Sequence, residues 1–236
     1  MKKYHAIFFD IDDTLIDFKK SETLSLNQCH VSFFKNHVDL QQFYTDYSKI
    51  NHSLWKLAEE NKISPAIIGT ERFKQISDHY GLPINAEIPP YYEEQLIQNS
   101  TWIKGAPELL TVIKEHNIKI GFVTNGFSHI QKSKYKKLNL ARYSDILVIS
   151  EELGFSKPHP QIFLHALKLT NTEIANTLMV GDSLSSDGEG ARRLGMPFCW
   201  YNPEQAQNNR NWQPDFMISD LSSLPDINQR ILDGKN

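Results

Sequence analysis

The chain has 236 residues, of which 40% are hydrophobic and 22% are charged, a composition typical of a globular protein with a substantial core. A net charge of −3 argues against a nucleic-acid polymer or an acidic membrane surface as partner. The first apolar stretch is cut short at Asp10, and no apolar run approaches the ~20 residues that cross a bilayer. The only two cysteines, Cys29 and Cys199, are far apart, which favours a cytoplasmic protein with free thiols.

Six short apolar runs predict β-strands, at residues 5–9, 119–124, 145–150, 177–181, 198–201 and 216–219. Each run is nearly continuous, which is typical of strands buried on both faces of a parallel sheet. Helical patterns occupy the intervals at 107–116, 157–170 and 185–195. This alternation from about residue 101 onward predicts an α/β fold with a doubly wound parallel sheet.

Residues 17–100 contain no convincing strand. Apolar residues recur at helical spacing in 43–63 and again in 70–81, which ends at a glycine. The segments 88–95 and 102–107 look like the return path to the sheet. We therefore expect a helical insert over residues 17–100, and a core formed by residues 1–16 and 101–236.

Polar side chains follow four of the predicted strands. In chain order they are Asp10, Asp12 and Asp13, then Thr124 and Asn125, which precede Gly126, then Lys157, and finally Asp182 and Asp187. Ligands of open α/β sheets bind at the carboxyl ends of the strands. These residues, distant in sequence, are therefore expected to converge on one crevice.

The residue types in that crevice suit a phosphoryl group. Asp10, Asp12 and Asp182 supply oxygen ligands of the kind that Mg²⁺ prefers, and a cation makes neighbouring carboxylates tolerable. Lys157 and the Thr124 hydroxyl add donors for a second anion. Each feature alone has an ordinary explanation, such as a solvated turn, a helix cap or a surface charge. The interpretation therefore depends on all four occurring together at strand ends.

The four motifs resemble those of the haloacid dehalogenase (HAD) superfamily of phosphohydrolases, over essentially the whole chain. "DIDDT" is similar to the first motif, "VTNG" to the second, "SEELGFSKPHPQIF" to the third and "GDSLSSD" to the fourth. The resemblance implies a Rossmann-like core with a mobile cap. An insert after the first strand is similar to the α-helical (C1) type of cap.

The same resemblance implies catalytic roles for two aspartates. Asp10 would be the nucleophile that forms an aspartyl-phosphate. Asp12 would protonate the leaving alcohol and then activate water. For the first of these roles Asp12 has to begin protonated, a state that a neighbouring carboxylate favours. An acid/base at this position favours a phosphatase over a dehalogenase, and leaves a mutase open.

The resemblance also implies a set of binding residues. The phosphoryl group would be held by Thr124, the Asn125 backbone and Lys157, which also pairs with Asp10. The cofactor would be Mg²⁺, for which Mn²⁺ could substitute. Its ligands would be Asp10, the backbone carbonyl of Asp12 and Asp182, with Asp187 supporting the site. Asp13 and His159 receive no catalytic role.

The cap stretch "YSKINHSLWKLAEENKIS", with "ERF", "VISEELGFSKP" and "CWYN", resembles the bacterial noncanonical pyrimidine 5′-nucleotidases. This resemblance implies a small-molecule partner, a nucleoside monophosphate such as dUMP, dTMP or a UMP-like compound. A base could stack on Phe18 or Trp55, and Asn51 or Arg72 could hydrogen-bond it. The ordinary interpretation is packing within the cap for Trp55 and a surface charge for Arg72.

Other interpretations stay open at this point. The same core would serve a sugar-phosphate or phosphoglycolate phosphatase. A different class would be an inactive HAD scaffold that acts as a binding or regulatory protein. A protein-phosphatase role ranks lower, because a large helical cap would hinder a folded substrate. The sequence is compatible with a monomer or a homodimer.

Overall fold

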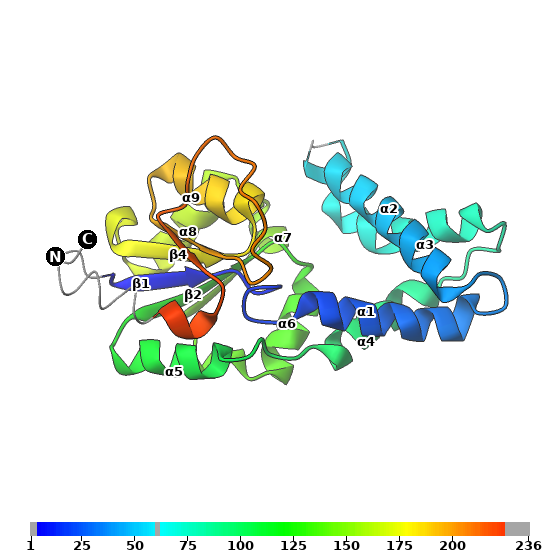
Figure 1. The fold of residues 1–236 in the computed structure, drawn as a ribbon, viewed down its shortest axis with the longest axis horizontal. Helices are drawn as coiled ribbons and strands as arrows, with labels where there is room; N and C mark the ends of the chain where they lie inside the picture. The colour runs from blue at the N-terminus through cyan, green and yellow to red at the C-terminus, as the bar shows by residue number, and fades with distance from the viewer. Residues whose placement is uncertain (1–3, 60–61, 225–236) are drawn as a thin grey trace. The chain divides into compact units, whose positions relative to one another are not determined.

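The computed structural model describes residues 4–59 and 62–224. The chain divides into two compact units, one formed by the residues up to Phe18 together with those from Thr101 onward, the other by Lys19–Ser100. The first unit contains the strands, and the second is helical (Figure 1).

A six-stranded parallel sheet forms the centre of the first unit, in the strand order β3-β2-β1-β4-β5-β6. Its strands are β1 (Ala6–Phe9), β2 (Lys119–Thr124), β3 (Ile146–Ile149), β4 (Thr177–Gly181), β5 (Phe198–Tyr201) and β6 (Phe216–Ile218). All six predicted strands are confirmed, with bounds that shift by a residue at most. Every residue of β1 and β4 is buried, which explains why these runs show no apolar–polar alternation.

Helices cover both faces of this sheet (Figure 1). They are α5 (Ala106–Glu115), α6 (Ser128–Lys137), α7 (Ser150–Leu153), α8 (Pro160–Thr170) and α9 (Glu189–Leu194). Successive side chains of a strand point to opposite faces. Ile7 and Phe9 therefore pack in a cluster with α5, whereas Ala6 and Phe8 pack in a second cluster with α8 and α9. These two layers confirm the predicted Rossmann-like α/β core.

The second unit consists of helices and has an aromatic core. Its helices are α1 (Phe18–Cys29), α2 (Leu40–Glu59), α3 (Ile68–His79) and α4 (Ile88–Asn99), with a π-helical turn at His30–Phe34. The rings of Phe34 and Phe43 lie 4.7 Å apart, and those of Phe73 and Tyr92 lie 5.1 Å apart. This unit lies within residues 17–100, the segment for which we expected a helical insert. None of the described helices, the 20-residue α2 included, is long and apolar enough to cross a membrane.

The segment at 88–95 differs from its sequence-based interpretation as a return path. It forms the first two turns of α4, and two prolines occupy the beginning of that helix. Proline is tolerated there, because the first backbone N–H groups of a helix have no intrahelical acceptor. Tyr92 and Leu96 of α4 are buried. The tertiary contacts of this helix face therefore stabilise a helix that the two prolines make hard to recognise in the sequence.

The chain leaves and re-enters the first unit along two paired segments. The Ile103 amide donates to the Leu15 carbonyl at 2.8 Å, and the Asp17 amide donates to the Thr101 carbonyl at 3.0 Å. An antiparallel bridge joins Ile16 to Trp102 between these bonds. The two ends of the insert are thus held together by the backbone of the first unit itself.

Candidate active site

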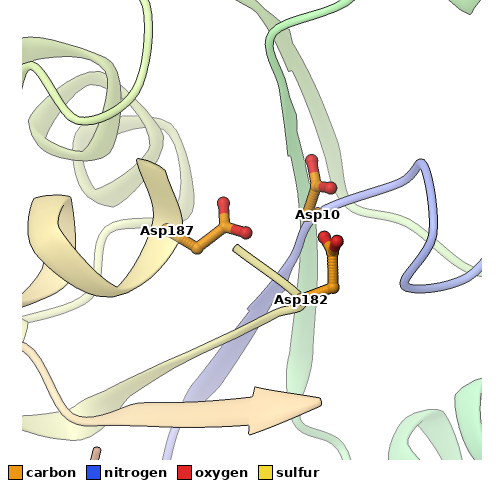
Figure 2. Close-up of side chains that lie close together, drawn as sticks. All are labelled: Asp10, Asp182 and Asp187. Atoms are coloured by element: carbon orange, nitrogen blue, oxygen red, sulfur yellow. The ribbon is translucent and has the colours of Figure 1, made fainter. Parts of the chain in front are cut away.

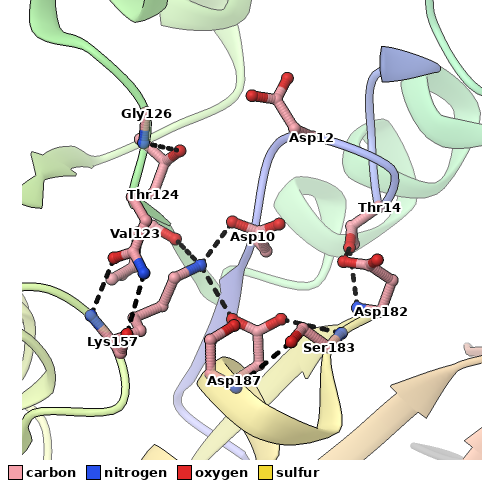
Figure 3. Close-up of polar contacts among 12 residues, drawn as sticks. Asp10, Asp12, Thr14, Val123, Thr124, Gly126, Lys157, Asp182, Ser183 and Asp187 are labelled. Atoms are coloured by element: carbon pink, nitrogen blue, oxygen red, sulfur yellow. Dashed lines mark hydrogen bonds and ion pairs between the residues drawn. The ribbon is translucent and has the colours of Figure 1, made fainter. Parts of the chain in front are cut away.

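The four motifs meet at the carboxyl edge of the central strands. Asp10 follows β1, Thr124 is the last residue of β2, and Asp182 follows β4. Lys157 lies on the segment between α7 and α8. Figure 3 shows these side chains in one cluster with Asp187, which comes from a π-helical turn at Leu184–Gly188.

Lys157 is the centre of this cluster, and its side chain is only 2% exposed. Its ammonium forms an ion pair with Oδ1 of Asp10, lies 2.8 Å from Oδ1 of Asp187, and donates to the Val123 carbonyl at 2.8 Å. These three oxygens lie around the buried ammonium. The ordinary interpretation of Lys157 as a surface charge is therefore wrong.

Asn125 joins the second motif to the third. Its amide nitrogen donates to the Lys157 carbonyl at 2.9 Å, and its Oδ1 accepts the Lys157 amide at 2.8 Å. The side chain of Asn125 is thus occupied by the backbone of the lysine segment. This pair of bonds fixes the backbone of Lys157 relative to the second motif.

Three carboxylates lie together beside Lys157. Oxygen atoms of Asp10, Asp182 and Asp187 are all within 4.8 Å of one another (Figure 2). Burial raises the pKa of Asp10 well above its usual value, although Lys157 opposes that shift. Burial, followed by the Asp187 carboxylate, raises the pKa of Asp182 to about 7. One ammonium does not compensate three carboxylates, so the group is suited to a bound cation.

Lys157 itself keeps its charge. Burial alone would lower the pKa of its ammonium, but the carboxylates of Asp10 and Asp187 outweigh that effect and raise the pKa above its ordinary value. The excess negative charge therefore resides on the carboxylates. Asp187, assigned only a supporting role from the sequence, contributes an oxygen to the acidic group as directly as the other two.

Two side chains that the sequence did not single out hold Asp182. The Thr14 hydroxyl accepts the Asp182 amide at 3.1 Å and lies 3.4 Å from its Oδ1, and the Trp200 indole donates to the Asp182 carbonyl at 2.8 Å. Thr14 belongs to the "DIDDT" motif, so a signal for it was present. Trp200 lies on β5, where an apolar strand gives no sign of this role.

Space for Asp187 depends on a glycine at the end of β4. A Cβ on Gly181 would lie 2.2 Å from Oδ2 of Asp187. That oxygen also accepts the Ser183 amide at 3.2 Å. The buried carboxylate thus occupies the volume that any other residue at position 181 would fill, which explains the glycine in "GDSLSSD".

Asp12 lies apart from this acidic group. Figure 3 shows its carboxylate directed away from Asp10 and Lys157. Its two oxygens contact Lys134 and Gln131, both of α6, each at 2.7 Å. Neither partner is evident from the sequence, from which we expected a carboxylate neighbour for Asp12. The charged group in contact with Asp12 is instead the Lys134 ammonium.

Asp13 and His159 have local structural roles. Asp13 adopts a left-handed conformation, with φ of 58°, which aspartate tolerates better than most residues. His159 precedes α8, and its ring accepts the Gln161 amide at 3.2 Å and stacks on Phe155 with 4.5 Å between centroids.

The nucleoside-binding candidates include residues with very different surroundings. Phe18, Asn51 and Trp55 are half-buried. Arg72 is only 4% exposed, so the surface-charge interpretation is wrong for it. Its guanidinium lies 4.6 Å from the centroid of the Tyr92 ring, and it donates to Asn51 at 3.4 Å. Whether any of these residues contacts a base stays a prediction.

Asp182 makes the stability of the metal-free protein depend on pH. The pKa of Asp182 is about 7 in the folded protein against an ordinary 3.8. Its contribution to the free energy of unfolding is therefore fully present below about pH 4 and is lost as pH rises through about 7. Mg²⁺ requires the ionised carboxylate. We expect the metal-free melting temperature to fall between pH 5 and pH 8, and Mg²⁺ to raise it more at pH 8. Differential scanning fluorimetry checks both expectations, and an equal magnesium shift at the two pH values would contradict them.

Comparison with known proteins places this chain in a family. The model of haloacid dehalogenase-like hydrolases matches residues 4–195. The chain is 31% identical to the pyrimidine 5′-nucleotidase YjjG of Escherichia coli, over 95% of this chain and 98% of that protein. It is 30% identical to the pyrimidine 5′-nucleotidase PynA of Streptococcus pneumoniae, over 98% of each.

A solved structure shares the fold over nearly the whole length. The magnesium-bound HAD-hydrolase YfnB of Bacillus subtilis aligns with a TM-score of 0.86 and 28% identity, covering 97% of this chain and 100% of that one. The resemblance noted from the four motifs is therefore confirmed. Given the match to the family model and the near-complete alignment with these relatives, the chain belongs to the haloacid dehalogenase-like hydrolases.

Proposed function

We propose that the protein is a Mg²⁺-dependent phosphomonoester hydrolase that acts through an aspartyl-phosphate on Asp10. The observation that carries the proposal is the position of Asp10, which is paired with the buried Lys157 ammonium and belongs to one acidic group with Asp182 and Asp187. A phosphoryl group brings negative charge to this point, and stabilisation of that charge supplies most of the catalysis of phosphoryl transfer.

The residues present fit a magnesium ion. Asp10, Asp182 and Asp187 offer three carboxylate oxygens in one small group, and family resemblance adds the backbone carbonyl of Asp12. When bound, the ion would neutralise the excess charge of the carboxylates and of the incoming phosphate. The Lys157 ammonium, the Thr124 hydroxyl and the Asn125 backbone amide would bind the phosphate oxygens and orient the phosphorus toward Asp10.

The proposed reaction has two steps. In the first, an oxygen of Asp10 forms a bond to phosphorus, the ester P–O bond breaks, and Asp12 passes a proton to the departing alkoxide. In the second, Asp12 takes a proton from water as that water attacks phosphorus, and the P–O bond to Asp10 breaks to release inorganic phosphate. The side chain of Asp12 is 24% exposed, so it can exchange protons with solvent between turnovers.

We further propose a pyrimidine nucleoside 5′-monophosphate as substrate. Two of the relatives aligned over nearly the full chain are pyrimidine 5′-nucleotidases. Asn51 and Trp55 are four residues apart on α2 and therefore share one face of that helix. In this proposal Trp55 or Phe18 stacks on the base, and Asn51, which is bonded to Arg72, presents its amide to the base edge.

Phosphate release from a panel of esters tests the proposal. We expect release that requires Mg²⁺ and is fastest for dUMP and dTMP among nucleoside monophosphates and sugar phosphates. A Trp55→Ala variant is expected to raise KM for nucleotides and leave sugar phosphates unchanged. Preference for sugar phosphates or phosphoglycolate would retain the chemistry and overturn the substrate. Absence of release from every ester, with metal present, would favour a binding or regulatory role for the scaffold.

A further inference from the structure

Lys134 and Gln131 bind the Asp12 carboxylate from one face of α6. They are three residues apart on that helix and therefore point in the same direction. Nζ of Lys134 lies 2.7 Å from Oδ1 of Asp12, and Nε2 of Gln131 lies 2.7 Å from Oδ2. Each carboxylate oxygen thus receives one donor, which fixes the rotation of the group and leaves a second lone pair on each oxygen for a proton.

Burial of both side chains is unfavourable for the stability of the fold. Lys134 and Gln131 are each 1% exposed, and a buried ammonium is tolerated only when it is paired. Oε1 of Gln131 is buried with no hydrogen-bond partner among the described residues, which is unfavourable because the oxygen has lost its water without gaining a donor. An apolar pair would fill the same volume without these costs, so the polar pair indicates a function.

The surrounding residues adapt to this pair. A Cβ on Gly126 would lie 2.0 Å from Nε2 of Gln131, so the glycine of "VTNG" makes room for the amide that contacts Asp12. The ring of Phe18 lies with its centroid 4.9 Å from Nζ of Lys134, a cation–π distance that helps to keep the ammonium in place. Three separate segments of the first unit therefore converge on one orientation of the Asp12 carboxylate.

We propose that Lys134 and Gln131 are positioning residues for the reaction, which hold Asp12 in the orientation from which it exchanges protons with the leaving group and with water. This inference rests on the proposed aspartyl-phosphate chemistry. Neither residue touches the phosphoryl group in this scheme. Their effect reaches the reaction only through Asp12, so substrate binding should be nearly independent of them.

The two proton transfers separate this role from simple loss of structure. Release of p-nitrophenolate from p-nitrophenyl phosphate needs no proton, whereas hydrolysis of the aspartyl-phosphate still needs a base. A Lys134→Met variant is therefore expected to give a rapid burst of p-nitrophenol of about one equivalent per enzyme, followed by slow turnover. With a nucleoside monophosphate, we expect kcat to fall by about 10²–10³-fold and KM to change by less than about threefold.

Three further variants complete the experiment. Lys136→Met makes the same substitution at an exposed position of α6, and is expected to keep wild-type kinetics. Lys134→Arg keeps a cationic donor and should recover part of the lost kcat. Gln131→Met removes both the donor to Asp12 and the unpartnered oxygen, so it should lower kcat without loss of thermal stability, which keeps the test valid if Lys134→Met fails to fold.

The outcomes distinguish the two proposals. If the wild-type enzyme hydrolyses phosphate esters but Lys134→Met and Gln131→Met do so at the same rate, the positioning role is wrong. A rise in KM alone, without burst or loss of kcat, would equally overturn it. If the wild-type enzyme and an Asp10→Asn variant are alike in activity, the aspartyl-phosphate chemistry itself is wrong, whatever the α6 variants do.

Discussion

An Asp10→Asn variant is expected to lose phosphate release by about 10⁵–10⁶-fold, the effect seen when a covalent nucleophile is removed. The amide keeps the size of the side chain but has no anionic oxygen to attack phosphorus. Asp10 is only 8% exposed at the end of β1 and is paired with Lys157. A carboxylate ion from solution therefore cannot replace it as the nucleophile. Phosphate release under saturating Mg²⁺ measures the loss, and phosphoenzyme trapping should detect no labelled protein for this variant.

Asp13→Asn is the matched control for this substitution. Asp13 occupies a left-handed turn position with φ of 58°, a conformation that asparagine also tolerates. The control makes the same chemical change three residues away, and should keep activity within about threefold. Residual turnover above about 1% in Asp10→Asn, at unchanged melting temperature, would show that another group is the nucleophile.

A Lys157→Met variant is expected to lose both stability and activity. Removal of the ammonium leaves the buried carboxylates of Asp10 and Asp187 without their shared counter-ion. Breaking a buried ion pair from one side typically costs about 3–5 kcal/mol. Loss of a cationic donor to the phosphoryl group should lower kcat by about 10²–10³-fold in the protein that stays folded.

The pH dependence of this variant separates the electrostatic cause from loss of packing. Burial already raises the pKa of Asp10 with Lys157 in place, and removal of Lys157 should raise it further. A carboxyl group whose pKa is raised by folding destabilises the fold as pH rises. Urea unfolding of Lys157→Met without metal should therefore show a larger deficit against wild type at pH 8 than at pH 5. A deficit that is the same at both pH values would point to lost packing. Lys136→Met, at an exposed position of α6, should show no deficit.

Much of the fold could be predicted because strands that are buried on both faces have a clearly apolar sequence. β1 and β4 are buried on both faces, so their sequences are almost uninterruptedly apolar. The position of the site followed from the same fact, because a polar residue directly after such a strand lies at the carboxyl edge of the sheet. Lys157 needed the motif as well, since nothing in its local sequence indicates burial.

The parts that could not be predicted are polar residues buried by tertiary contacts. The sequence of α6, "SHIQKSKYKK", reads as a solvated basic helix, yet Gln131 and Lys134 are buried. Their burial depends on Asp12, which is more than a hundred residues away in sequence. Arg72 is similar, because its guanidinium lies close to three aromatic rings of the second unit. Periodicity reports the apolar face of a helix and carries no information on such pairs.

The backbone pairing between Leu15–Asp17 and Thr101–Ile103 has a consequence for how such enzymes diversify. The ends of the insert are already joined by these backbone hydrogen bonds. A segment of different length between them would therefore pay nearly the same entropic cost of loop closure, because that cost grows only slowly with length. Insertion of new sequence succeeds most readily at sites of this kind. The hydrolytic chemistry can thus be inherited unchanged while the intervening segment is exchanged, and substrate range becomes a trait that evolution can alter separately from the reaction.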